Sequence, residues 1–293
     1  MHPRGYYIHL LSLVVFGQSE EKIINGVEVL PPFKYPWMAA IRMRGGPYCG
    51  GVFLNTRSVV TAAHCSKSGN NDDLRVLAHR HDFRKSSQDE GGFSLKVLKR
   101  IVHPEHDISL WHLEIQSGFQ IADNIILGDI PKNREGSTLV TALGWGWLRF
   151  GGPVANSLQQ VQVPLYDSIK CKTIWGRRGI SLDPDSQVCA GWSEGKRDTC
   201  KGDSGGPLFY TSADGKAYLL GLTSFGEPCA KANVPTVYVK VIYFASWISE
   251  NLDSYNVTTP TNISTITPPL RPNLEASRIG HLPFNSLSQA AEL

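Results

Sequence analysis

Short apolar runs alternate with glycine, proline and polar residues through the first part of the chain. Three of these runs occupy residues 37–41, 49–54 and 59–63. Runs of this length with turn residues between them are typical of β-strands, whereas an amphipathic helix needs a longer segment with a 3.6-residue repeat. The pattern therefore predicts an all-β chain, built as a barrel or a sandwich.

The N-terminal segment has a different pattern. Residues 7–16 form an apolar run behind Arg4, and Gly17 and Ser19 offer small side chains for cleavage. A run of this kind is typical of a secretory leader and is too short to cross a bilayer. We predict a signal peptide over residues 1–17, cut between residues 17 and 19, and a secreted protein.

Residues 253–293 are rich in Ser, Thr and Pro and hold no hydrophobic anchor. Such a composition favours a disordered extension, because it buries too little apolar surface to fold. Sequons of the type Asn-x-Ser/Thr predict glycosylation at Asn256 and Asn262. No membrane anchor is expected.

Composition narrows the function further. The chain has 293 residues, of which 41% are hydrophobic and 19% charged, with a formal net charge of +3. No dense basic block is present, so nucleic-acid binding is not predicted. His79 and His81 lie close in sequence, but no Cys-x-x-Cys pair accompanies them, and we predict no metal and no cofactor. An even number of cysteines in a secreted chain favours disulfides, although spacing alone leaves their pairing open.

The glycine-rich stretch over residues 198–207 is the strongest candidate for chemistry. A serine hydroxyl is a poor nucleophile unless a base takes its proton and donors stabilise the oxyanion. Glycines at 202, 205 and 206 permit positive φ, so that the N–H groups of Gly202 and Ser204 can form an oxyanion hole. A plain turn with an incidental serine is the alternative, because Gly, Asp, Ser and Pro dominate turns.

Two residues complete a candidate catalytic set. His64 follows the apolar run 59–63 and precedes Cys65, which places it at a predicted strand end. Asp107 opens the apolar segment 108–111, where burial penalises an unpaired carboxylate. An imidazole N–H would satisfy that carboxylate. We predict His64 as the base and Asp107 as its orienting partner, with a purely structural histidine as the alternative.

A possible switch precedes the first strand. Cleavage after Lys22 would create a new ammonium on Ile23, and a buried Asp203 would need such a cation. We predict a propeptide over residues 18–22 and an ion pair between Ile23 and Asp203 that acts as a switch. The alternative is a charged segment without function.

These motifs resemble a known family. Their residues are Thr61-Ala62-Ala63-His64-Cys65, Asp107-Ile108-Ser109-Leu110 and Gly202-Asp203-Ser204-Gly205-Gly206-Pro207. Three separated motifs in this order are similar to those of the trypsin/chymotrypsin-like serine proteases, and the resemblance covers residues 23–252. It implies two packed antiparallel six-stranded β-barrels, with a boundary near residues 120–137, and a C-terminal helix over residues 243–252. It also implies the disulfides Cys49–Cys65, Cys171–Cys189 and Cys200–Cys229.

The resemblance implies an activity as well. A member of this family is a secreted endopeptidase made as a zymogen, in which the base, its orienting partner and the serine hydrolyse peptide bonds. The expected partners are protein or peptide substrates, an activating protease and protein inhibitors, and the expected state is a monomer. A catalytically silent homologue that acts as a binding module is the alternative from a different class.

The residues expected to form the specificity pocket combine a trypsin-like floor with an elastase-like wall. By resemblance, Asp198 forms the floor of the pocket for the residue before the scissile bond, as in trypsin, and Ser224, Phe225 and Gly226 lie along the substrate. A carboxylate there favours Lys or Arg. Thr236 stands where trypsin-like members have glycine, and its side chain either narrows the pocket or donates to the carboxylate. We expect cleavage after Lys or Arg with reduced efficiency; elastase-like cleavage after small residues is the alternative.

Overall fold

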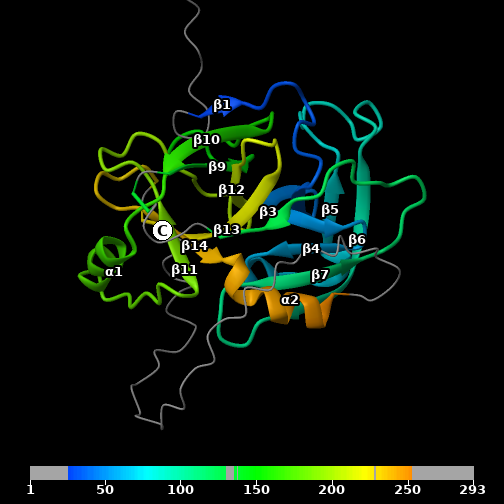
Figure 1. The fold of residues 1–293 in the computed structure, drawn as a ribbon. Coiled ribbons are helices and arrows are strands. Elements are labelled where there is room, and N and C mark those ends of the chain that lie inside the picture. Colours follow the sequence, from blue (N-terminus) through cyan, green and yellow to red (C-terminus); the bar gives the residue numbers. More distant parts are fainter. Residues whose placement is uncertain (1–25, 130–134, 137, 228, 253–293) are drawn as a thin grey trace, which may run out of the picture.

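The computed structural model describes residues 26–129, 135–136, 138–227 and 229–252, and within them the chain is mostly β-structure (Figure 1). Two groups of strands lie side by side, one formed by the first part of the chain and one by the later part. The predictions that fall outside the described residues are the signal peptide (1–17), the propeptide (18–22), Lys22, Ile23, the tail (253–293), Asn256 and Asn262.

The first group is a closed antiparallel barrel with the strand order β2-β3-β4-β7-β6-β5. Its strands are β2 (Met38–Met43), β3 (Gly46–Asn55), β4 (Ser58–Thr61), β5 (Leu74–Ala78), β6 (Phe93–Val102) and β7 (Ser109–Leu113). The three predicted apolar runs lie in β2, β3 and β4, so those strand predictions are confirmed. The third run leaves its strand after Thr61 and continues into a short 3-10 helix, Ala63–Ser66.

The second group is a sheet of eight strands with the order β1-β10-β9-β12-β13-β14-β11, and β8 pairs with β13 beside this path. Its strands are β1 (Val27–Glu28), β8 (Ile126–Leu127), β9 (Leu139–Gly144), β10 (Gln159–Pro164), β11 (Gln187–Ala190), β12 (Pro207–Thr211), β13 (Ala217–Phe225) and β14 (Thr236–Lys240). Apart from β1, all strands of this group lie at or after Ile126.

The predicted fold class, two packed β-barrels with a C-terminal helix, is confirmed. The second barrel is less regular than the first, because β10 and β11 meet only through an isolated bridge between Leu165 and Ala190. Pro164, the last residue of β10, has no N–H to donate, so a longer ladder is not supported at this point.

The C-terminal helix is shorter than predicted. The helix α2 spans Ala245–Asn251, and Val241–Phe244 before it forms a 3-10 turn. This turn consists of β-branched and aromatic residues, which are weaker helix formers than Ala or Leu. The other α-helix, α1 (Ser168–Gly176), begins after Asp167, whose side chain accepts a hydrogen bond from the N–H of Lys170. No helix among the described residues is long and apolar enough to cross a membrane.

A shared hydrophobic core joins the two barrels. Trp37, just before β2, packs edge-on against Phe209 of β12, with ring centroids 4.9 Å apart. The backbones also touch, since a Cβ added to Gly50 of β3 would stand 2.9 Å from the Cα of Gly206. These contacts fix the barrels against each other and bring the loops at their junction together.

The loop between β5 and β6 is organised around an internal cation. Only 4% of the Arg80 side chain is exposed. Its guanidinium donates to Glu90 Oε2 at 2.6 Å, to Ser87 Oγ at 2.8 Å and to the carbonyl of Lys85 at 2.8 Å. The buried charge is therefore both paired and hydrogen-bonded, which offsets its desolvation.

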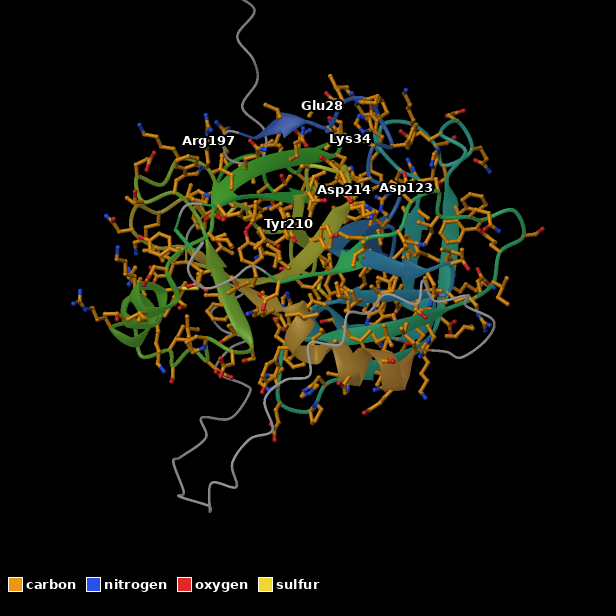
Figure 2. The ribbon with its side chains drawn as sticks, in the orientation of Figure 1. Glu28, Lys34, Asp123, Arg197, Tyr210 and Asp214 are labelled. Carbon is orange, nitrogen blue, oxygen red and sulfur yellow. A yellow bond between two sulfur atoms is a disulfide. The ribbon has the colours of Figure 1, made fainter. Side chains whose placement is uncertain are left out.

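This loop also contacts the N-terminal strand and the second barrel. Glu28 of β1, labelled in Figure 2, accepts a hydrogen bond from His81 Nε2 at 2.8 Å. The carbonyl of His81 accepts a hydrogen bond from Trp145 Nε1 at 3.0 Å. The loop thus links β1 to the segment that follows β9.

Candidate active site

His64 and Asp107 are brought together by two neighbouring strands. His64 lies in the 3-10 helix after β4, and Asp107 lies two residues before β7. Strands β4 and β7 are paired, with Thr61 opposite Ser109. His64 Nδ1 stands 2.9 Å from Asp107 Oδ2 and donates to it, because a carboxylate only accepts. The structure therefore brings these two predicted residues into contact.

Two further donors hold the Asp107 carboxylate. The backbone N–H of His64 donates to its Oδ1 at 2.9 Å, and the Ser224 hydroxyl donates to its Oδ2 at 2.6 Å. Ser224 belongs to β13, so the carboxylate connects the two barrels. The hydrogen bond at Nδ1 leaves Nε2 of His64 as the acceptor. Among the described residues, Nε2 has no hydrogen-bond partner.

Ser204 lies on a loop that is fastened to the first barrel. Its carbonyl accepts a hydrogen bond from the N–H of Gly50 at 2.8 Å and stands 3.8 Å from the Sγ of Cys65, the neighbour of His64. Gly205 has φ +73°, and a Cβ there would clash with Thr61 Oγ1. Only glycine therefore permits this close approach of the serine loop to the first barrel.

The backbone of the serine loop presents donors. Gly202 has φ +99°, a conformation that glycine adopts without strain. Gly202 and Ser204 are both partly exposed, and their N–H groups donate no hydrogen bond within the described residues. These two N–H groups are therefore free for a ligand atom.

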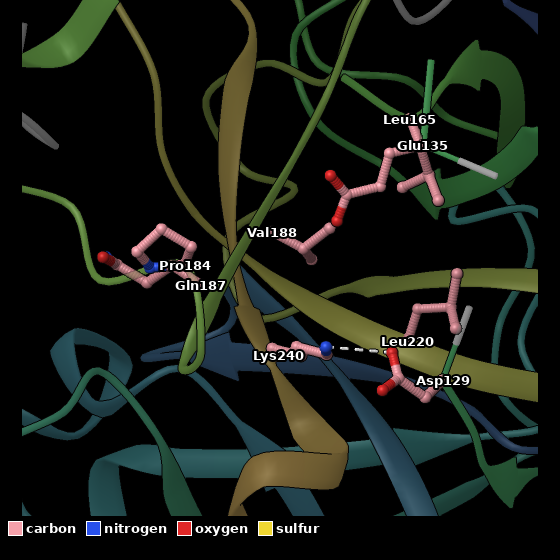
Figure 3. A pocket seen from close by; sticks show the side chains of 8 residues that line it. All are labelled: Asp129, Glu135, Leu165, Pro184, Gln187, Val188, Leu220 and Lys240. Carbon is pink, nitrogen blue, oxygen red and sulfur yellow. Dashed lines mark ion pairs between the residues drawn. The ribbon is translucent and has the colours of Figure 1, made fainter. Parts of the chain in front are cut away.

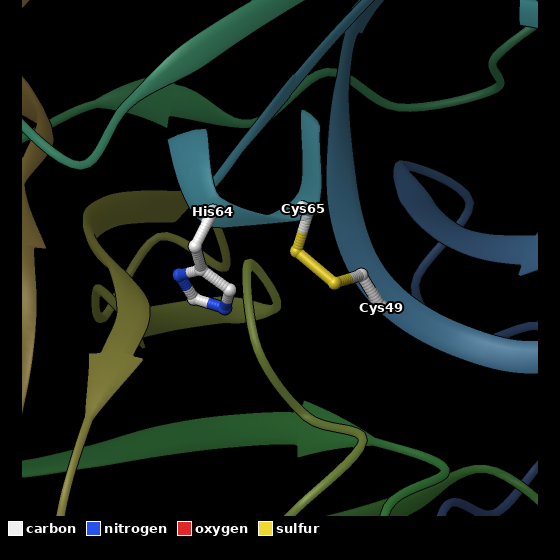
Figure 4. A group of neighbouring side chains, drawn as sticks. All are labelled: Cys49, His64 and Cys65. Atoms are coloured by element: carbon white, nitrogen blue, oxygen red, sulfur yellow. A yellow bond between two sulfur atoms is a disulfide. The ribbon is translucent and has the colours of Figure 1, made fainter. Parts of the chain in front are cut away.

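The structure contains the disulfides Cys49–Cys65, Cys171–Cys189 and Cys200–Cys229, the pairs that the resemblance implied. The first lies next to His64 (Figure 4). Cys49, His64 and Cys65 form the one group in the described part of the chain whose ligand atoms lie close enough for a metal ion. The sulfur atoms of Cys49 and Cys65 are bonded to each other in a disulfide. A metal ion needs cysteine thiolates, so this group does not fit a metal.

Asp203 is fully buried within the serine loop. Its Oδ1 accepts from the N–H of Gly146 and its Oδ2 from the N–H of Cys200, both at 2.8 Å. Burial raises the pKa of Asp203 to about 7, because desolvation outweighs these two donors. Gly144 and Gly146 enclose the carboxylate so closely that a Cβ on either would clash with it. No described residue forms an ion pair with Asp203, and Ile23 lies outside the described residues.

Asp198 is closed off by protein donors and is only 4% exposed. Its Oδ1 accepts from the Thr236 hydroxyl and the Thr199 N–H, each at 2.8 Å, and its Oδ2 accepts from the Ala230 N–H at 3.0 Å. Burial raises the pKa of Asp198 to about 6 despite these donors. A Cβ added to Gly226 would stand 3.0 Å from Thr236 Oγ1. The Thr236 hydroxyl thus lies between Gly226 and the carboxylate.

Phe225 is buried rather than presented to solvent. It is 6% exposed and packs edge-on against Trp175 of α1, with ring centroids 5.2 Å apart. Trp175 Nε1 donates to the carbonyl of Pro235 at 3.1 Å, next to Thr236. The Phe225 ring is therefore part of a buried core cluster that also contains Trp175 and Val237.

A shallow cleft on the second barrel contains none of the predicted site residues (Figure 3). It is lined by Asp129, Glu135, Leu165, Pro184, Gln187, Val188, Leu220 and Lys240. An ion pair of 3.0 Å joins Lys240 to Asp129 across it. This charged cleft contains carboxylates but no serine, cysteine or histidine among its lining residues, and it is separate from the candidate site.

Sequence reasoning missed the backbone donors to the Asp198 carboxylate. The N–H groups of Thr199 and Ala230 on Asp198 have no signature in a sequence, because every residue except proline carries one. The two glycines on either side of Trp145, which enclose Asp203, are visible in the sequence. That signal indicates a close backbone approach but does not name the group that approaches.

The comparisons with known proteins agree with this geometry. The family model described as Trypsin matches residues 23–248. Trypsin eta of Drosophila erecta is 31% identical over 257 residues, which cover 81% of this chain and 93% of that protein. The venom peptide isomerase heavy chain of Agelenopsis aperta is 32% identical over 248 residues, which cover 74% of this chain and 95% of that protein.

A longer relative shares only part of its length. Serine proteinase stubble of Drosophila melanogaster is 31% identical over 254 residues, which cover 80% of this chain but 32% of that protein. The chain thus spans about a third of that relative. The family model covers well over half of the chain, and the chain therefore belongs to the trypsin-like serine protease family.

Proposed function

We propose that this chain is a serine endopeptidase that hydrolyses peptide bonds through Ser204, His64 and Asp107. The supporting observation is the state of His64, whose Nδ1 is bonded to Asp107 while its Nε2 has no partner within the described residues. In the proposed reaction, Nε2 takes the Ser204 proton as the hydroxyl attacks the carbonyl carbon. The imidazolium then gives the proton to the leaving amine, and water releases the acyl group by the same steps.

The oxyanion hole in this proposal consists of the N–H groups of Gly202 and Ser204. Both groups are unused by other described residues, which supports the assignment. Such donors bind the oxyanion of the tetrahedral intermediate more strongly than the carbonyl of the substrate. Loss of one donor would cost about 3 kcal/mol of transition-state stabilisation.

We propose further that the protein is secreted as a zymogen. Asp203 is buried without a described cation, and its pKa is raised to about 7 by desolvation. An ammonium on Ile23, freed by cleavage after Lys22, would stabilise the charged form of this carboxylate. The hydrogen bond from the N–H of Cys200 to Asp203 would pass that change to the serine loop. The disulfides are consistent with an oxidising compartment.

The proposed substrates carry Lys or Arg before the scissile bond. A guanidinium or ammonium at Asp198 would favour the ionised carboxylate and would compete with the Thr236 hydroxyl for its oxygen. This competition is the reason to expect reduced efficiency. Elastase-like cleavage after small residues is the alternative, and the position of the Thr236 hydroxyl between Gly226 and the carboxylate favours it.

The test uses secreted protein cut after Lys22, with Ser204→Ala as the control. Peptides would differ only at the residue before the scissile bond, which is Lys, Arg, Ala, Val or Phe. Cleavage after Lys or Arg by the parent protein but not by the control supports the proposal. Cleavage after Ala or Val would support the elastase-like alternative.

A second measurement separates an enzyme from a silent homologue. A phosphonylating reagent for active serines should label Ser204 in the cut protein and should not label Ser204→Ala. Absence of both labelling and cleavage, with Ile23 verified as the free N-terminus, would overturn the proposal in favour of a binding module.

A further inference from the structure

The 3-10 helix over Ala63–Ser66 carries His64 and is too short to fix its own orientation. It has four residues and no side-chain hydrogen bond at its N-terminal end. One turn of helix fixes several dihedral angles for very few hydrogen bonds, so contacts with the rest of the protein must set its position. The orientation of His64 therefore depends on what holds this helix.

Three consecutive residues of the helix are each tied to another part of the protein. His64 bonds to Asp107 through Nδ1, and Cys65 forms a disulfide with β3. The hydroxyl of Ser66 donates to Ser109 Oγ at 2.9 Å. The first two ties belong to the proposed catalytic set and to a disulfide, whereas the third has no role in the mechanism described above.

The hydroxyls of Ser66 and Ser109 belong to a chain of hydrogen bonds with one direction. Ser109 Oγ donates its single proton to the carbonyl of Ile101 at 3.0 Å, so it can only accept from Ser66. Trp111 Nε1 donates to Ser66 Oγ at 2.8 Å and to Ser109 Oγ at 3.1 Å. Ser109 and Trp111 are fully buried, so a lost partner would leave a costly unpaired polar group. We call Ser66, Ser109 and Trp111 the serine–tryptophan clamp.

The clamp lies directly beside the contact between His64 and Asp107. Ser66 follows His64 by two residues, and Ser109 follows Asp107 by two residues. Ser109 begins β7 and pairs with Thr61 of β4, the strand that leads into the helix. The same two segments are thus joined twice, once through the imidazole and once through the two hydroxyls.

The helix also contacts the serine loop. Cys65 Sγ stands 3.8 Å from the carbonyl of Ser204, and that carbonyl accepts a hydrogen bond from the N–H of Gly50 of β3 at 2.8 Å. The disulfide therefore fixes the helix to the strand that holds Ser204, while the clamp fixes it to β7. Without the clamp, the helix would be free to shift relative to β7, and such a shift changes the approach of His64 Nε2 to the Ser204 hydroxyl.

Arg100 of β6 holds the segment that follows the helix. Its guanidinium donates to the carbonyls of Ser66 and Gly69, each at 2.9 Å. The course of the backbone after Ser66 is thus fixed by bonds that do not involve the clamp hydroxyls. Loss of a clamp hydroxyl should therefore alter the orientation of the helix without unfolding the segment behind it.

We propose that the serine–tryptophan clamp is a positioning device that holds His64 Nε2 at the distance from the Ser204 hydroxyl that proton transfer requires. This inference rests on the proposed function, because it assigns residues that support the proposed base. Proton transfer depends steeply on geometry, and a misplacement of about 1 Å can reduce the rate by about a hundredfold. The clamp residues are buried or half-buried behind the helix, so their loss should act on kcat and leave KM nearly unchanged.

The experiment measures kcat and KM for the protein cut after Lys22, on the peptide that the parent protein cleaves fastest. The variants are Ser66→Ala, Ser109→Ala and the double variant, and each kcat is divided by the folded fraction at the assay temperature. Each single variant should lower kcat by about tenfold, with KM within about twofold of the parent value. The double variant should be no slower than the slower single variant, because both changes break the same chain of hydrogen bonds.

Ser58→Ala is the matched control. Ser58 is also a fully buried serine between β4 and β7, and its Oγ lies 3.4 Å from His112 Nδ1 at the end of β4 away from His64. This variant removes a comparable hydroxyl and should keep the parent kcat. Ser66→Thr retains the hydroxyl at a half-buried position and should restore most of the kcat lost in Ser66→Ala.

The outcomes separate the clamp from the proposed function. Parent-like kcat in both Ser66→Ala and Ser109→Ala, with the peptide still cleaved, would overturn the clamp and leave the endopeptidase proposal intact. An equal loss of kcat in Ser58→Ala would overturn it as well. If Ser109→Ala does not fold, Ser66→Ala and its recovery in Ser66→Thr decide the question. No cleavage by the parent protein would overturn the proposed function and this inference with it.

Discussion

The two barrels contribute to the candidate site in different ways. His64 and Asp107 lie beside the paired strands β4 and β7, and their contact follows from strand register. Ser204 lies on a loop whose shape depends on glycines and on the enclosed carboxylate of Asp203. The first barrel therefore holds its residues in place by regular structure, whereas the second holds Ser204 by a buried charge.

Because of this difference, we expect the activity to be regulated through the serine loop of the second barrel. Asp203 is a buried carboxylate with two N–H donors and no described cation. Its pKa of about 7 places it near equal amounts of the charged and the neutral form at neutral pH. A new cation changes that balance. His64 and Asp107 are positioned instead by the paired strands β4 and β7 and by the hydrogen bond from Ser224 to Asp107. The following predictions test this contrast, from the largest expected effect to the smallest.

The largest effect should come from removing one of the proposed catalytic residues, either His64 of the first barrel or Ser204 of the second. We expect His64→Ala and Ser204→Ala each to lower kcat by about 10⁴-fold to 10⁶-fold, because each ends the same proton transfer. The double variant should be no slower than the slower single variant. If the loss of kcat in the double variant equalled the product of the two single losses, the two residues would act independently.

Blocking cleavage should affect only the second barrel. Lys22→Gln should lower activity by about a hundredfold or more, since Asp203 would lack its cation and the oxyanion donors would lose their support. The measurement is kcat/KM after treatment with a protease that cuts after lysine. Full activity of the uncut variant would rule out the switch.

The pH dependence that Asp203 gives to stability should be opposite in sign to that given by Glu90 of the first barrel. Burial raises the folded-state pKa of Asp203 to about 7, so the folded chain retains a proton that the unfolded chain loses from about pH 4 upward. The uncut protein should therefore lose about 2–4 kcal/mol of stability as pH rises through this range. Asp203→Asn should remove that loss in urea titrations at pH 4.5 and pH 8.

Glu90 of the first barrel is the matched comparison. Burial raises its pKa, but the hydrogen bonds from Arg80 and from backbone N–H groups lower it further, so the net shift is downward. Its contribution to stability is present above the unfolded pKa and is lost as pH falls. The difference in unfolding free energy between the parent protein and Glu90→Gln should thus rise with pH. The corresponding difference for Asp203→Asn should fall with pH, and equal signs would contradict the contrast.

Glycine substitutions should separate the barrels by size of effect. Gly144→Ala would bring a Cβ into the carboxylate of Asp203, and we expect a loss of about 3 kcal/mol in unfolding free energy. Gly45, in the turn between β2 and β3, has φ +82° and open space around its Cβ position. Gly45→Ala should cost only about 1 kcal/mol, from backbone strain alone. Equal losses would show that Asp203 is not tightly enclosed.

The smallest effect concerns specificity. Thr236→Gly removes the hydroxyl that bonds to Asp198 and clears the space beside Gly226. We expect kcat/KM on Lys and Arg peptides to rise by about tenfold, which is the equivalent of one good hydrogen bond. Thr236→Ser keeps the hydroxyl and serves as the control. An unchanged rate in Thr236→Gly would show that the threonine does not limit the pocket.

The contrast between the barrels also explains what could be predicted from the sequence. Strands β2, β3 and β4 and the contact between His64 and Asp107 follow from apolar runs and side-chain motifs, both of which are visible in a sequence. The donors to Asp198 from Ala230 and Thr199 are backbone groups and leave no such trace. The contact of Trp147 with the serine loop is equally invisible, because it is a main-chain hydrogen bond to the carbonyl of Lys201.

Arg80 has a consequence for the conditions under which the first barrel keeps its shape. A loop that is held together by a dissociable ion loses order when the ion is diluted or chelated, because its stability follows the free concentration. The guanidinium of Arg80 is tethered to the same chain, so its effective concentration beside Glu90 is set by geometry alone. The order that it gives to this loop is therefore independent of dilution.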